Sequence, residues 1–451
     1  MTHFATETIA SAGARLRAGS TTALDLTNRC LDAIGTFGKT TNAFTAVHDA
    51  TAREAAARLD AELAGGHDRG PLHGIPISLK DLVDEAGIAN TAGSKALEDR
   101  IPATDAPLVT RLREAGAVII GRTNLHEFAL GTTSDDSAFG PVHNPHDLTR
   151  SPGGSSGGSG AAVATGMSIA SIGTDTGGSI RIPAAACGVV GLKPSSGDVP
   201  IDGIVPLSFT LDHAGPLALS VQDAAWVWQV LSGRHTSSVV PRPLAHVHLT
   251  RLTGYFDAPL EAAVRDAFNM ALGHLRDTGV VVTDAEVDNT DRIGATYVDI
   301  VLSEAALWHA PILDSRKDHY RPTVHARISH GRTITAVDYL RGLNACADFS
   351  HQISTLLDSC DALVLPTLPI TAPVTGESDV VVDPASGVAL PVRAVMLKHT
   401  QLFNLTGNPA ISLPLRAAGL PVGLQLVGRI GRTAELLDIA AACERALGTA
   451  S

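Results

Sequence analysis

Short apolar runs separated by glycine and proline turns are the feature that most restricts how this chain can fold. From residue 75 onward the sequence alternates between such runs, IPISL, AVIIG, SIASIG and VVGL, and amphipathic segments such as APLVTRLREAG. The runs suit strands buried on both faces, and the amphipathic segments suit helices that cover them. We predict an α/β fold, a single large domain with a central mixed, mostly parallel β-sheet covered by helices on both faces.

Helical patterns precede and follow this alternation. The segment ATAREAAARLDAELAGG predicts a helix that stops at Gly65 and Gly66. A second helix is predicted from Asp257 and Pro259 to Gly279, before the strand-like VVVTDAEV. Near the end, ALVLPT, PAISLPL and VGLQLVG indicate further strands, and TAELLDIAAACERAL indicates a closing helix.

Charge and cysteine content exclude several classes of protein. The 34 Lys and Arg against 46 Asp and Glu give a net charge of -12, and no basic run is present, which argues against nucleic-acid binding. No apolar run approaches the roughly 18 residues that a membrane span needs. The five cysteines contain no CxxC pair, which favours reduced thiols and a cytoplasmic location.

Two turns rich in serine and glycine carry the strongest chemical signal. They are SPGGSSGGSG and TDTGGSIRIP, and they place Ser155 and Ser179 24 residues apart. A flexible loop is the simplest explanation, and a phosphate cradle is a second, although neither turn has the GK[ST] of a Walker motif. A third is a nucleophile elbow, because GxSxG fits with either Ser155 or Ser156 at its centre, which would need a later acid and histidine.

Lys80 suggests a fourth explanation. It ends the apolar run IPISL, where an isolated lysine would simply reach water or pair with Asp81 or Asp84. A lysine at the end of a buried strand can instead lose its charge, because burial penalises the ammonium form by up to about 3–5 pKa units. A neutral lysine can then act as a base toward a serine hydroxyl.

These stretches together resemble the amidase signature family, the Ser-cisSer-Lys amidohydrolases. The resemblance rests on GGSSGGSGAAVATG followed by GTDTGGSIRIPAAACGVVGLKP, on GIPISLKD, and on GRTNLHEFALGTTSDDSAFGPVHNPHDLTRSPGG. It continues through TQLFNLTGNPAISLP and GLPVGLQLVG. The similar stretches cover most of residues 70–215 and 360–430.

The resemblance implies a role for individual residues. Lys80 would be the general base, Ser155 a bridging serine held by a cis peptide bond, and Ser179 the nucleophile. The oxyanion hole would consist of backbone groups of Thr176, Gly177, Gly178 and Ser179, where the glycines allow the substrate to approach closely. No cofactor or metal is implied.

The resemblance also suggests part of the substrate pocket. Ala129 would belong to the wall of the acyl pocket, and Gly131 and Thr132 lie on the same loop. The rest of the pocket is expected from more divergent parts of the chain.

The resemblance further divides the single domain, residues 1–451, into four parts. Residues 1–69 would be N-terminal packing helices, and 70–215 the catalytic core. Residues from about 240 to 360 would form a variable helical region that contributes to the pocket, and 361–451 the last strands and the closing helix.

Other polar residues near the turns are interpreted as structural. Asp175, Arg181 and Ser156 are expected to hold the turns by hydrogen bonds. Cys187, in the apolar AAACGVVG, is expected to be inert packing.

Four residues raise the question of a metal site. His143 and His146 in HNPH, and His126 with Glu127, miss the HExxH pattern and lack a third ligand at a recognised spacing. We therefore predict no metal site.

Three functions follow as hypotheses. The first is a serine hydrolase, an amidase or acylamidase that cleaves amide-type C–N bonds through an acyl-enzyme on Ser179, with carbamates or urethanes as an extension. The second is the glutaminase subunit of a tRNA-dependent amidotransferase, and the third an inactive binding protein on the same fold. The expected partner is a small amide or carbamate, with a homodimer left open.

Overall fold

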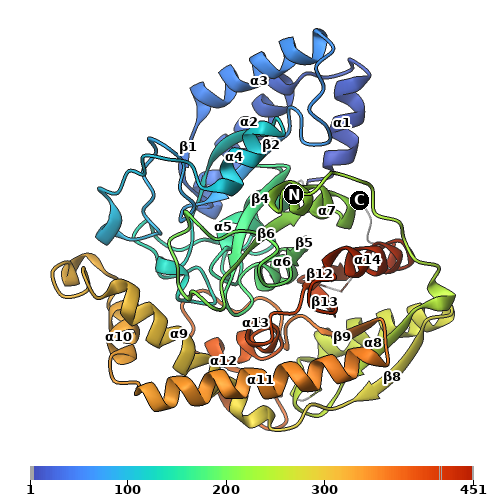
Figure 1. Ribbon diagram of the computed structural model, residues 1–451. Coiled ribbons are helices and arrows are strands. Elements are labelled where there is room, and N and C mark those ends of the chain that lie inside the picture. Colours follow the sequence, from blue (N-terminus) through green and yellow to red (C-terminus); the bar gives the residue numbers. More distant parts are fainter. Residues whose placement is uncertain (1–4, 258, 416, 418, 449–451) are drawn as a thin grey trace.

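The computed structural model describes residues 5–448 except 258, 416 and 418, and it contains one large central sheet (Figure 1). The sheet has eleven strands in the order β1-β3-β2-β4-β6-β5-β12-β13-β9-β7-β8. Their bounds are β1 Phe44–Val47, β2 Pro76–Lys80, β3 Val118–Thr123, β4 Ala170–Asp175, β5 Val190–Lys193, β6 His213–Ala218, β7 His248–Leu252, β8 Val281–Ala285, β9 Ala362–Pro366, β12 Ala410–Leu415 and β13 Val422–Val427. A separate hairpin pairs β10 Asp379–Val381 with β11 Ala389–Pro391.

The sheet is mixed, and its parallel pairings form two blocks. Strands β3, β2 and β4 are parallel to one another, as are β9, β7 and β8. Antiparallel pairings from β4 through β6, β5, β12 and β13 to β9 connect the two blocks, and β1 pairs antiparallel with β3. The predicted single α/β domain with a mixed sheet is confirmed, and parallel pairing is the rule inside these two blocks.

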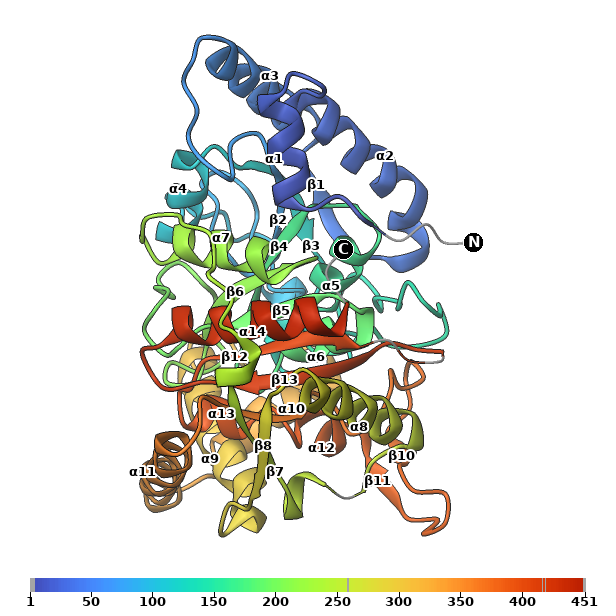
Figure 2. The ribbon, with the colours of Figure 1, turned by 90° about the vertical axis from the view of Figure 1, so that its right-hand side faces the viewer.

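Helices cover both faces of the sheet, as predicted. In Figure 2 α7 Val221–Leu231, α8 Ala262–Asp277 and α14 Thr433–Leu447 lie in front of it, and α5 Gly157–Ala164 and α6 Arg181–Cys187 lie behind. The remaining helices are α1 Ile9–Arg17, α2 Ala23–Thr41, α3 Asp49–Ala64, α4 Pro107–Glu114, α9 Ile293–His309, α10 Pro322–Gly331, α11 Ala336–Asp358, α12 Val392–Leu397 and α13 Leu402–Leu405. Helices α9, α10 and α11 pack together along the lower edge in Figure 1.

The predicted elements are present, with two differences. The N-terminal segment contains strand β1 between α2 and α3, where only helices were expected. Helix α8 begins at Ala262 and not near Pro259, because Glu261 is held in extended backbone by bonds to the segment after β9. The Glu261 N–H donates to the Pro369 carbonyl at 2.9 Å, and the Thr371 N–H donates to the Glu261 carboxylate at 2.7 Å.

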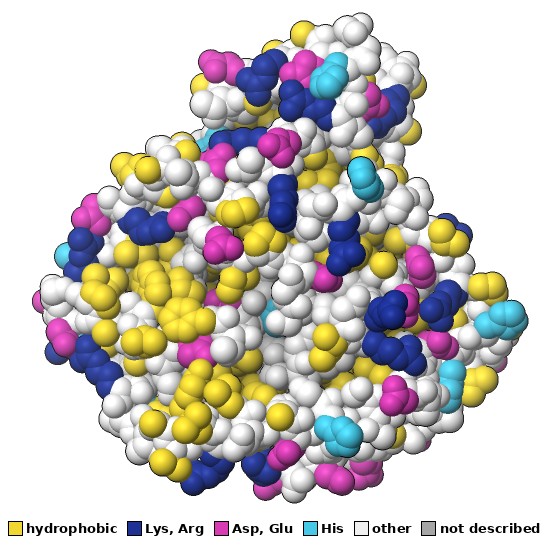
Figure 3. Space-filling model, viewed as in Figure 1, with side chains coloured by type: hydrophobic (Ala, Val, Ile, Leu, Met, Phe, Trp, Pro, Cys, Tyr) yellow, Lys and Arg dark blue, Asp and Glu magenta, His cyan; other side chains and the backbone are white. Residues whose placement is uncertain are grey.

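The surface carries interspersed charges of both signs on the face seen in Figure 3, and apolar side chains gather on its left side. Exposed apolar residues of the chain include Ile101, Phe209 and Leu307. Among the described residues, no helix is both long and apolar enough to cross a membrane.

The parallel pairing of β2 and β4 positions the site. Carboxyl ends of parallel neighbours lie at the same edge of a sheet, so Lys80 at the end of β2 lies beside Thr174 and Asp175 at the end of β4. All residues of both strands are buried. The two serine-glycine turns run along this edge, one before α5 and one between β4 and α6.

Candidate active site

Lys80 is fully buried and contacts two hydroxyl groups. Its Nζ donates to Ser155 Oγ at 2.7 Å and to Thr174 Oγ1 at 2.8 Å. Neither Lys80 nor Ser155 has any exposed surface, so water does not compete for these bonds. The pairing with Asp81 or Asp84, considered from sequence, does not occur: Asp81 binds Arg122 and Asp84 binds Arg100.

Burial lowers the pKa of Lys80 from 10.5 to about 7, although the charges of Asp212 and Asp175 oppose the change. Burial thus outweighs two carboxylates that favour the ammonium form. A substantial fraction of Lys80 is therefore neutral near pH 7, as a general base requires.

Ser155 lies in a turn whose backbone is held on several sides. Gly153 and Gly154 have φ of 79° and 63°, which favours glycine over other residues. The Gly154 N–H donates to the Thr132 carbonyl at 2.7 Å, and its carbonyl accepts from Ser134 Oγ at 2.8 Å. These bonds fix the position from which Ser155 reaches Lys80.

Ser179 lies on the other side of Ser155. The backbone N–H of Ser155 donates to Ser179 Oγ at 3.0 Å, while the Ser155 hydroxyl accepts from Lys80. The fold thus brings Lys80, Ser155 and Ser179 together from β2, the first turn and the second turn. Ser179 is 6% exposed, whereas Lys80 and Ser155 have no exposed surface.

The second turn presents unpaired backbone donors. Within the part of the chain that the structure describes, the N–H groups of Gly177, Gly178 and Ser179 donate to no other group of the protein. The turn is fixed through its carbonyls, since Thr400 Oγ1 donates to the Gly177 carbonyl at 2.5 Å and the Ile182 N–H donates to the Gly178 carbonyl at 2.7 Å. Free N–H groups beside a serine hydroxyl can bind a developing oxyanion.

Space around this turn is tight. A Cβ atom at Gly177 would lie 2.5 Å from the Tyr297 hydroxyl oxygen, and one at Gly178 would lie 2.3 Å from Thr400 Oγ1. Side chains from α9 and from the segment after α12 therefore pack directly against the turn. Thr176 at its start donates from its hydroxyl to Asp212.

Asp175 and Arg181 hold the turn, as predicted for them. Both are fully buried, with Arg181 Nη2 2.8 Å from Asp175 Oδ1. Asp175 also accepts from the Ile180 N–H at 3.1 Å. Burial alone would raise the pKa of Asp175, but the charge and hydrogen bonds of Arg181 hold it well below its usual value. Ser156 donates to the Thr174 carbonyl at 3.1 Å and so joins the two turns.

Three residues of the site were not found from sequence. Thr174 binds Lys80, Asp212 acts on Lys80 through its charge, and Tyr297 lies against Gly177. Burial raises the pKa of Asp212 to about 6 despite its bond to Thr176. Thr174 stands inside the quoted GTDTGGS motif, so its position could have been noticed, whereas Asp212 and Tyr297 lie in sequence without a local signal.

Of the remaining candidates, His126 reaches this centre through its backbone, whose N–H donates to the Ser155 carbonyl at 3.2 Å. Cys187 is buried, and burial raises the pKa of its thiol, which is the condition of an unreactive cysteine. His146 Nε2 lies 2.9 Å from the Cys187 carbonyl. Among the described residues, no three His, Cys, Asp or Glu side chains gather in a way that could hold a metal ion.

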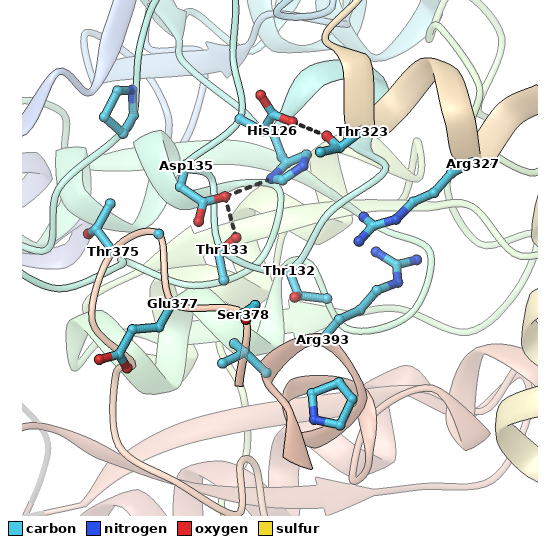
Figure 4. A pocket seen from close by; sticks show the side chains of 15 residues that line it. His126, Thr132, Thr133, Asp135, Thr323, Arg327, Thr375, Glu377, Ser378 and Arg393 are labelled. Carbon is cyan, nitrogen blue, oxygen red and sulfur yellow. Dashed lines mark hydrogen bonds and ion pairs between the residues drawn. The ribbon is translucent and has the colours of Figure 1, made fainter. Parts of the chain in front are cut away.

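A pocket of about 680 Å³ lies between the loop that follows β3, helix α10 and the segment 375–393, and neither Lys80, Ser155 nor Ser179 lines it (Figure 4). Thr132, one of the predicted substrate residues, lines it. Ala129 is buried in the short 3-10 helix Glu127–Ala129, and Gly131 packs against the His126 ring. Neither Ala129 nor Gly131 lines the pocket. Besides Thr132, the lining residues are His126, Thr133, Asp135, Asp136, Pro141, Thr323, Arg327, Thr375, Gly376, Glu377, Ser378, Pro391, Val392 and Arg393.

Comparison with known proteins gives consistent matches over nearly the whole chain. The profile of the Amidase family matches residues 25–437. A glutamyl-tRNA(Gln) amidotransferase subunit from Desulforapulum autotrophicum is 36% identical over 470 residues, covering 94% of this chain and 93% of that protein. A solved structure of an amidase superposes with a TM-score of 0.92 at 36% identity, covering 98% of this chain and 100% of the other.

A second solved structure is more distant. The corresponding glutamyl-tRNA(Gln) amidotransferase subunit from Thermotoga maritima superposes with a TM-score of 0.77 at 31% identity, covering 94% of this chain and 91% of the other. Fold, site and matches define an enzyme of the amidohydrolase class, which acts on C–N bonds other than peptide bonds. The chain belongs to the Amidase family.

Proposed function

We propose that this protein hydrolyses small amides through an acyl-enzyme formed on Ser179. The observation that carries the proposal is the fully buried Lys80, whose Nζ lies 2.7 Å from Ser155 Oγ while the Ser155 backbone contacts Ser179. A serine hydroxyl is a weak nucleophile until a base takes its proton, and a neutral lysine beside a second hydroxyl supplies that base.

Each proton in the proposed cycle has a defined donor and acceptor. Ser179 Oγ attacks the carbonyl carbon and passes its proton to Ser155 Oγ, which passes its own proton to Lys80 Nζ. The C–N bond then breaks, and the same groups return a proton to the leaving nitrogen. Water attacks the acyl group in the second half, giving the acid and restoring the Ser179 hydroxyl.

Backbone donors support the charged intermediate. The N–H groups of Gly177, Gly178 and Ser179 have no partner within the described part of the chain, and in the proposed cycle they would donate to the carbonyl oxygen as it becomes negative. Removal of one such donor costs roughly 2.7–4 kcal/mol of transition-state stabilisation in other hydrolases. Small amides, anilides and aryl carbamates share this acyl-transfer geometry, and we expect turnover of at least one of these groups.

The test uses two variants and a covalent probe. We expect Ser179→Ala and Lys80→Met to lower kcat by at least about 1,000-fold, because the relay acts as a unit. Methionine nearly matches lysine in volume and leaves no large cavity in the buried site. Circular dichroism and thermal unfolding would verify that both variants are folded.

Covalent labelling distinguishes the proposed role of Ser179 as nucleophile from that of Lys80 as base. A fluorophosphonate should label Ser179 in the parent, slowly in Lys80→Met and not in Ser179→Ala. Near-parental turnover in folded Lys80→Met, or labelling at another residue, would contradict the proposal.

A second candidate is the amidase subunit of a tRNA-dependent amidotransferase. The curated relatives favour it, since proteins named as subunits of glutamyl-tRNA(Gln) amidotransferase are 33–38% identical to this chain. The superposition on the solved amidase supports the first candidate, with a TM-score of 0.92 against 0.77 for the Thermotoga maritima subunit. Release of ammonia from glutamine, with no turnover of other amides unless partner subunits are added, would support the second candidate.

A further inference from the structure

Glu304 on α9 is a buried carboxylate that accepts four hydrogen bonds from neutral groups. Its Oε2 accepts from the Ser208 hydroxyl at 2.6 Å and from the Thr210 N–H at 3.1 Å. Its Oε1 accepts from the Thr210 hydroxyl at 2.8 Å and from the hydroxyl of Tyr339, on α11, at 2.9 Å. Hydrogen bonds to a carboxylate are stronger than neutral ones and depend on direction. Glu304 therefore holds the loop 207–212 against α9.

The same loop is bonded to the second turn through Asp212. The Asp212 carboxylate accepts from two backbone N–H groups of the loop, at 2.9 Å and 3.1 Å, and the second of these belongs to Ser208. The Thr176 hydroxyl donates to the same carboxylate. Ser208 thus binds Glu304 through its hydroxyl and Asp212 through its backbone. A continuous series of hydrogen bonds leads from α9 through the loop to Thr176, at the start of the turn that carries Ser179.

Helix α9 also contacts this turn directly. Tyr297 packs against Gly177, and its hydroxyl leaves no room for a Cβ atom there. Tyr297 and Glu304 are seven residues apart, so they lie on the same face of the helix. Both side chains are buried. One face of α9 therefore reaches two consecutive residues of the turn, Thr176 through the loop and Gly177 by packing.

The position of Thr176 matters because the next three residues carry the N–H groups proposed for the oxyanion. A displacement of about 1 Å in an active site can cost about 100-fold in rate. Glu304 does not line the pocket of Figure 4. Its effect on catalysis would therefore come through the turn and not through contact with the substrate.

We propose that Glu304 is a positioning residue of the active site: through Ser208 and Asp212 it fixes Thr176, and with it the N–H groups that receive the carbonyl oxygen of the amide. The inference rests on the proposed amide hydrolysis. It adds to that function a residue of the helical region, outside the substrate pocket, that keeps the turn in its working position.

The first experiment separates the effect on kcat from the effect on KM. In Glu304→Met the side chain stays unbranched, and the carboxylate that accepts the four hydrogen bonds is lost. We expect kcat for the preferred amide to fall about 10- to 100-fold, the scale of a small displacement in the site. KM should change by less than about threefold, because an interaction made only in the transition state is lost. A folded variant with the kcat of the parent would contradict the inference.

Glu304→Gln is the conservative variant. Its amide oxygen can replace Oε2, which accepts from the Thr210 N–H. Its NH2 group can donate to the hydroxyls of Thr210 and Tyr339, because a hydroxyl can accept as well as donate. We expect this variant to keep kcat within about threefold of the parent, since the hydrogen bonds are retained. A Gln variant as slow as Glu304→Met would contradict positioning by hydrogen bonds.

Glu444→Met is the matched control. Glu444 is also buried, and its carboxylate accepts from the Val221 N–H at 2.9 Å, so it joins α14 to α7 and not to the second turn. Urea unfolding should show a loss of stability in both Met variants, and kcat should fall in Glu304→Met alone. Equal losses of kcat in the two variants would mean that general destabilisation is the cause, which would overturn the inference.

A double-mutant cycle tests whether Glu304 acts through Asp212. Asp212→Ala removes the acceptor of the Thr176 hydroxyl. If Glu304 acts through Asp212, the double variant of Glu304→Met with Asp212→Ala should be no slower than Asp212→Ala alone. Losses of kcat that multiply would show two independent effects and contradict the inference.

Failure of this inference differs from failure of the proposed function. If the parent cleaves amides and Glu304→Met keeps its kcat, the positioning role is wrong and amide hydrolysis stands. If the parent cleaves no amide and a fluorophosphonate does not label Ser179, the proposed hydrolysis fails. Crystal structures of the parent and of Glu304→Met then decide the positioning directly: a displaced turn at 176–179 supports it, and an unchanged turn overturns it.

Discussion

Lys80 and Lys193 are both fully buried lysines, but their surroundings give them different chemistry. Burial lowers the pKa of both. Lys193 Nζ donates to the Pro194 carbonyl at 3.1 Å, whereas Lys80 Nζ donates to the hydroxyls of Ser155 and Thr174. A carbonyl has no proton to give, so only Lys80 is placed to take part in proton transfer.

The pKa of Lys80 predicts how activity depends on pH. Lys80 is neutral, and able to accept a proton, above its pKa of about 7. We therefore expect kcat/KM for a neutral amide to fall about tenfold for each pH unit below about 7 and to level off above it. Initial rates from pH 5 to pH 9, with buffers of constant ionic strength, would measure the profile.

The direction in which kcat/KM changes with pH decides whether neutral Lys80 is the base. A profile that is flat from pH 5 to pH 9, or that falls as the pH rises through neutrality, would mean that a neutral lysine is not the base. Unchanged circular dichroism over the same range is the control for unfolding.

At the scale of elements, the loop between β4 and α6 carries the reactive groups. The loop is short, and Asp175 at the end of β4 fixes its far end by accepting from the Ile180 N–H. Gly178 has a φ of 140°, and its neighbours leave no room for a side chain. The loop can adopt this conformation because Gly177 and Gly178 have no Cβ atom that would collide with its neighbours. In this conformation the N–H groups of Gly177, Gly178 and Ser179 have no partner in the described part of the chain.

Substitution of Gly178 tests this view of the loop. In Gly178→Ala the new methyl group would collide with Thr400 Oγ1, and the loop would have to move. We expect kcat to fall about 100-fold or more, the scale of a lost oxyanion donor. Steady-state rates on the preferred amide would measure the loss.

Gly19→Ala is the matched control. Gly19 also has a positive φ, 67°, but nothing lies within 4 Å of its Cβ position, between α1 and α2. In the Gly19→Ala variant the free energy of unfolding should fall by about 1 kcal/mol because of backbone strain, and the activity should be unchanged. Equal activity of the two variants would contradict the assigned role of the loop.

At the scale of the molecule, Arg181 connects distant parts of the chain. Its guanidinium donates to Asp175 on β4, to Asn404 on α13 at 2.7 Å, and to Gln425 on β13 at 2.7 Å. Asn404 and Gln425 follow Arg181 by more than 200 residues. The loop that carries Ser179 is therefore held in place by helix α13 and strand β13.

Removal of this arginine should destabilise the whole protein. In Arg181→Met the carboxylate of Asp175 is left buried without its partner, and we expect the free energy of unfolding to fall by about 3–5 kcal/mol. Urea unfolding followed by tryptophan fluorescence would measure it. The double variant Arg181→Met with Asp175→Asn should lose less than the sum of the two single variants, and strict additivity would contradict a direct coupling.

Local patterns were sufficient to predict most of the fold, and the resemblance to the amidase signature family selected the residues of the site. The apolar runs IPISL, AVIIG and SIASIG overlap β2, β3 and β4, the parallel strands that carry the site. Strand β1 was missed because its four residues, two half-buried and two exposed, lie between two helices and give no periodic signal. The pairing of the middle strands also had no local signal, because it joins β5 to β12, which are far apart in the sequence.

The sequence by itself determined the glycine turns, the strand that ends at Lys80 and the candidate serines, because backbone freedom and burial pattern are properties of short segments. Tertiary structure alone decided that Thr174 and Asp212 act on Lys80. It also decided that Tyr297 and Thr400 pack against the second turn. Arg327 and Arg393, which are far apart in the sequence, meet in one pocket for the same reason. The physical reason is that hydrogen bonds and charges act over a few ångströms in space, and distance along the chain does not reveal them.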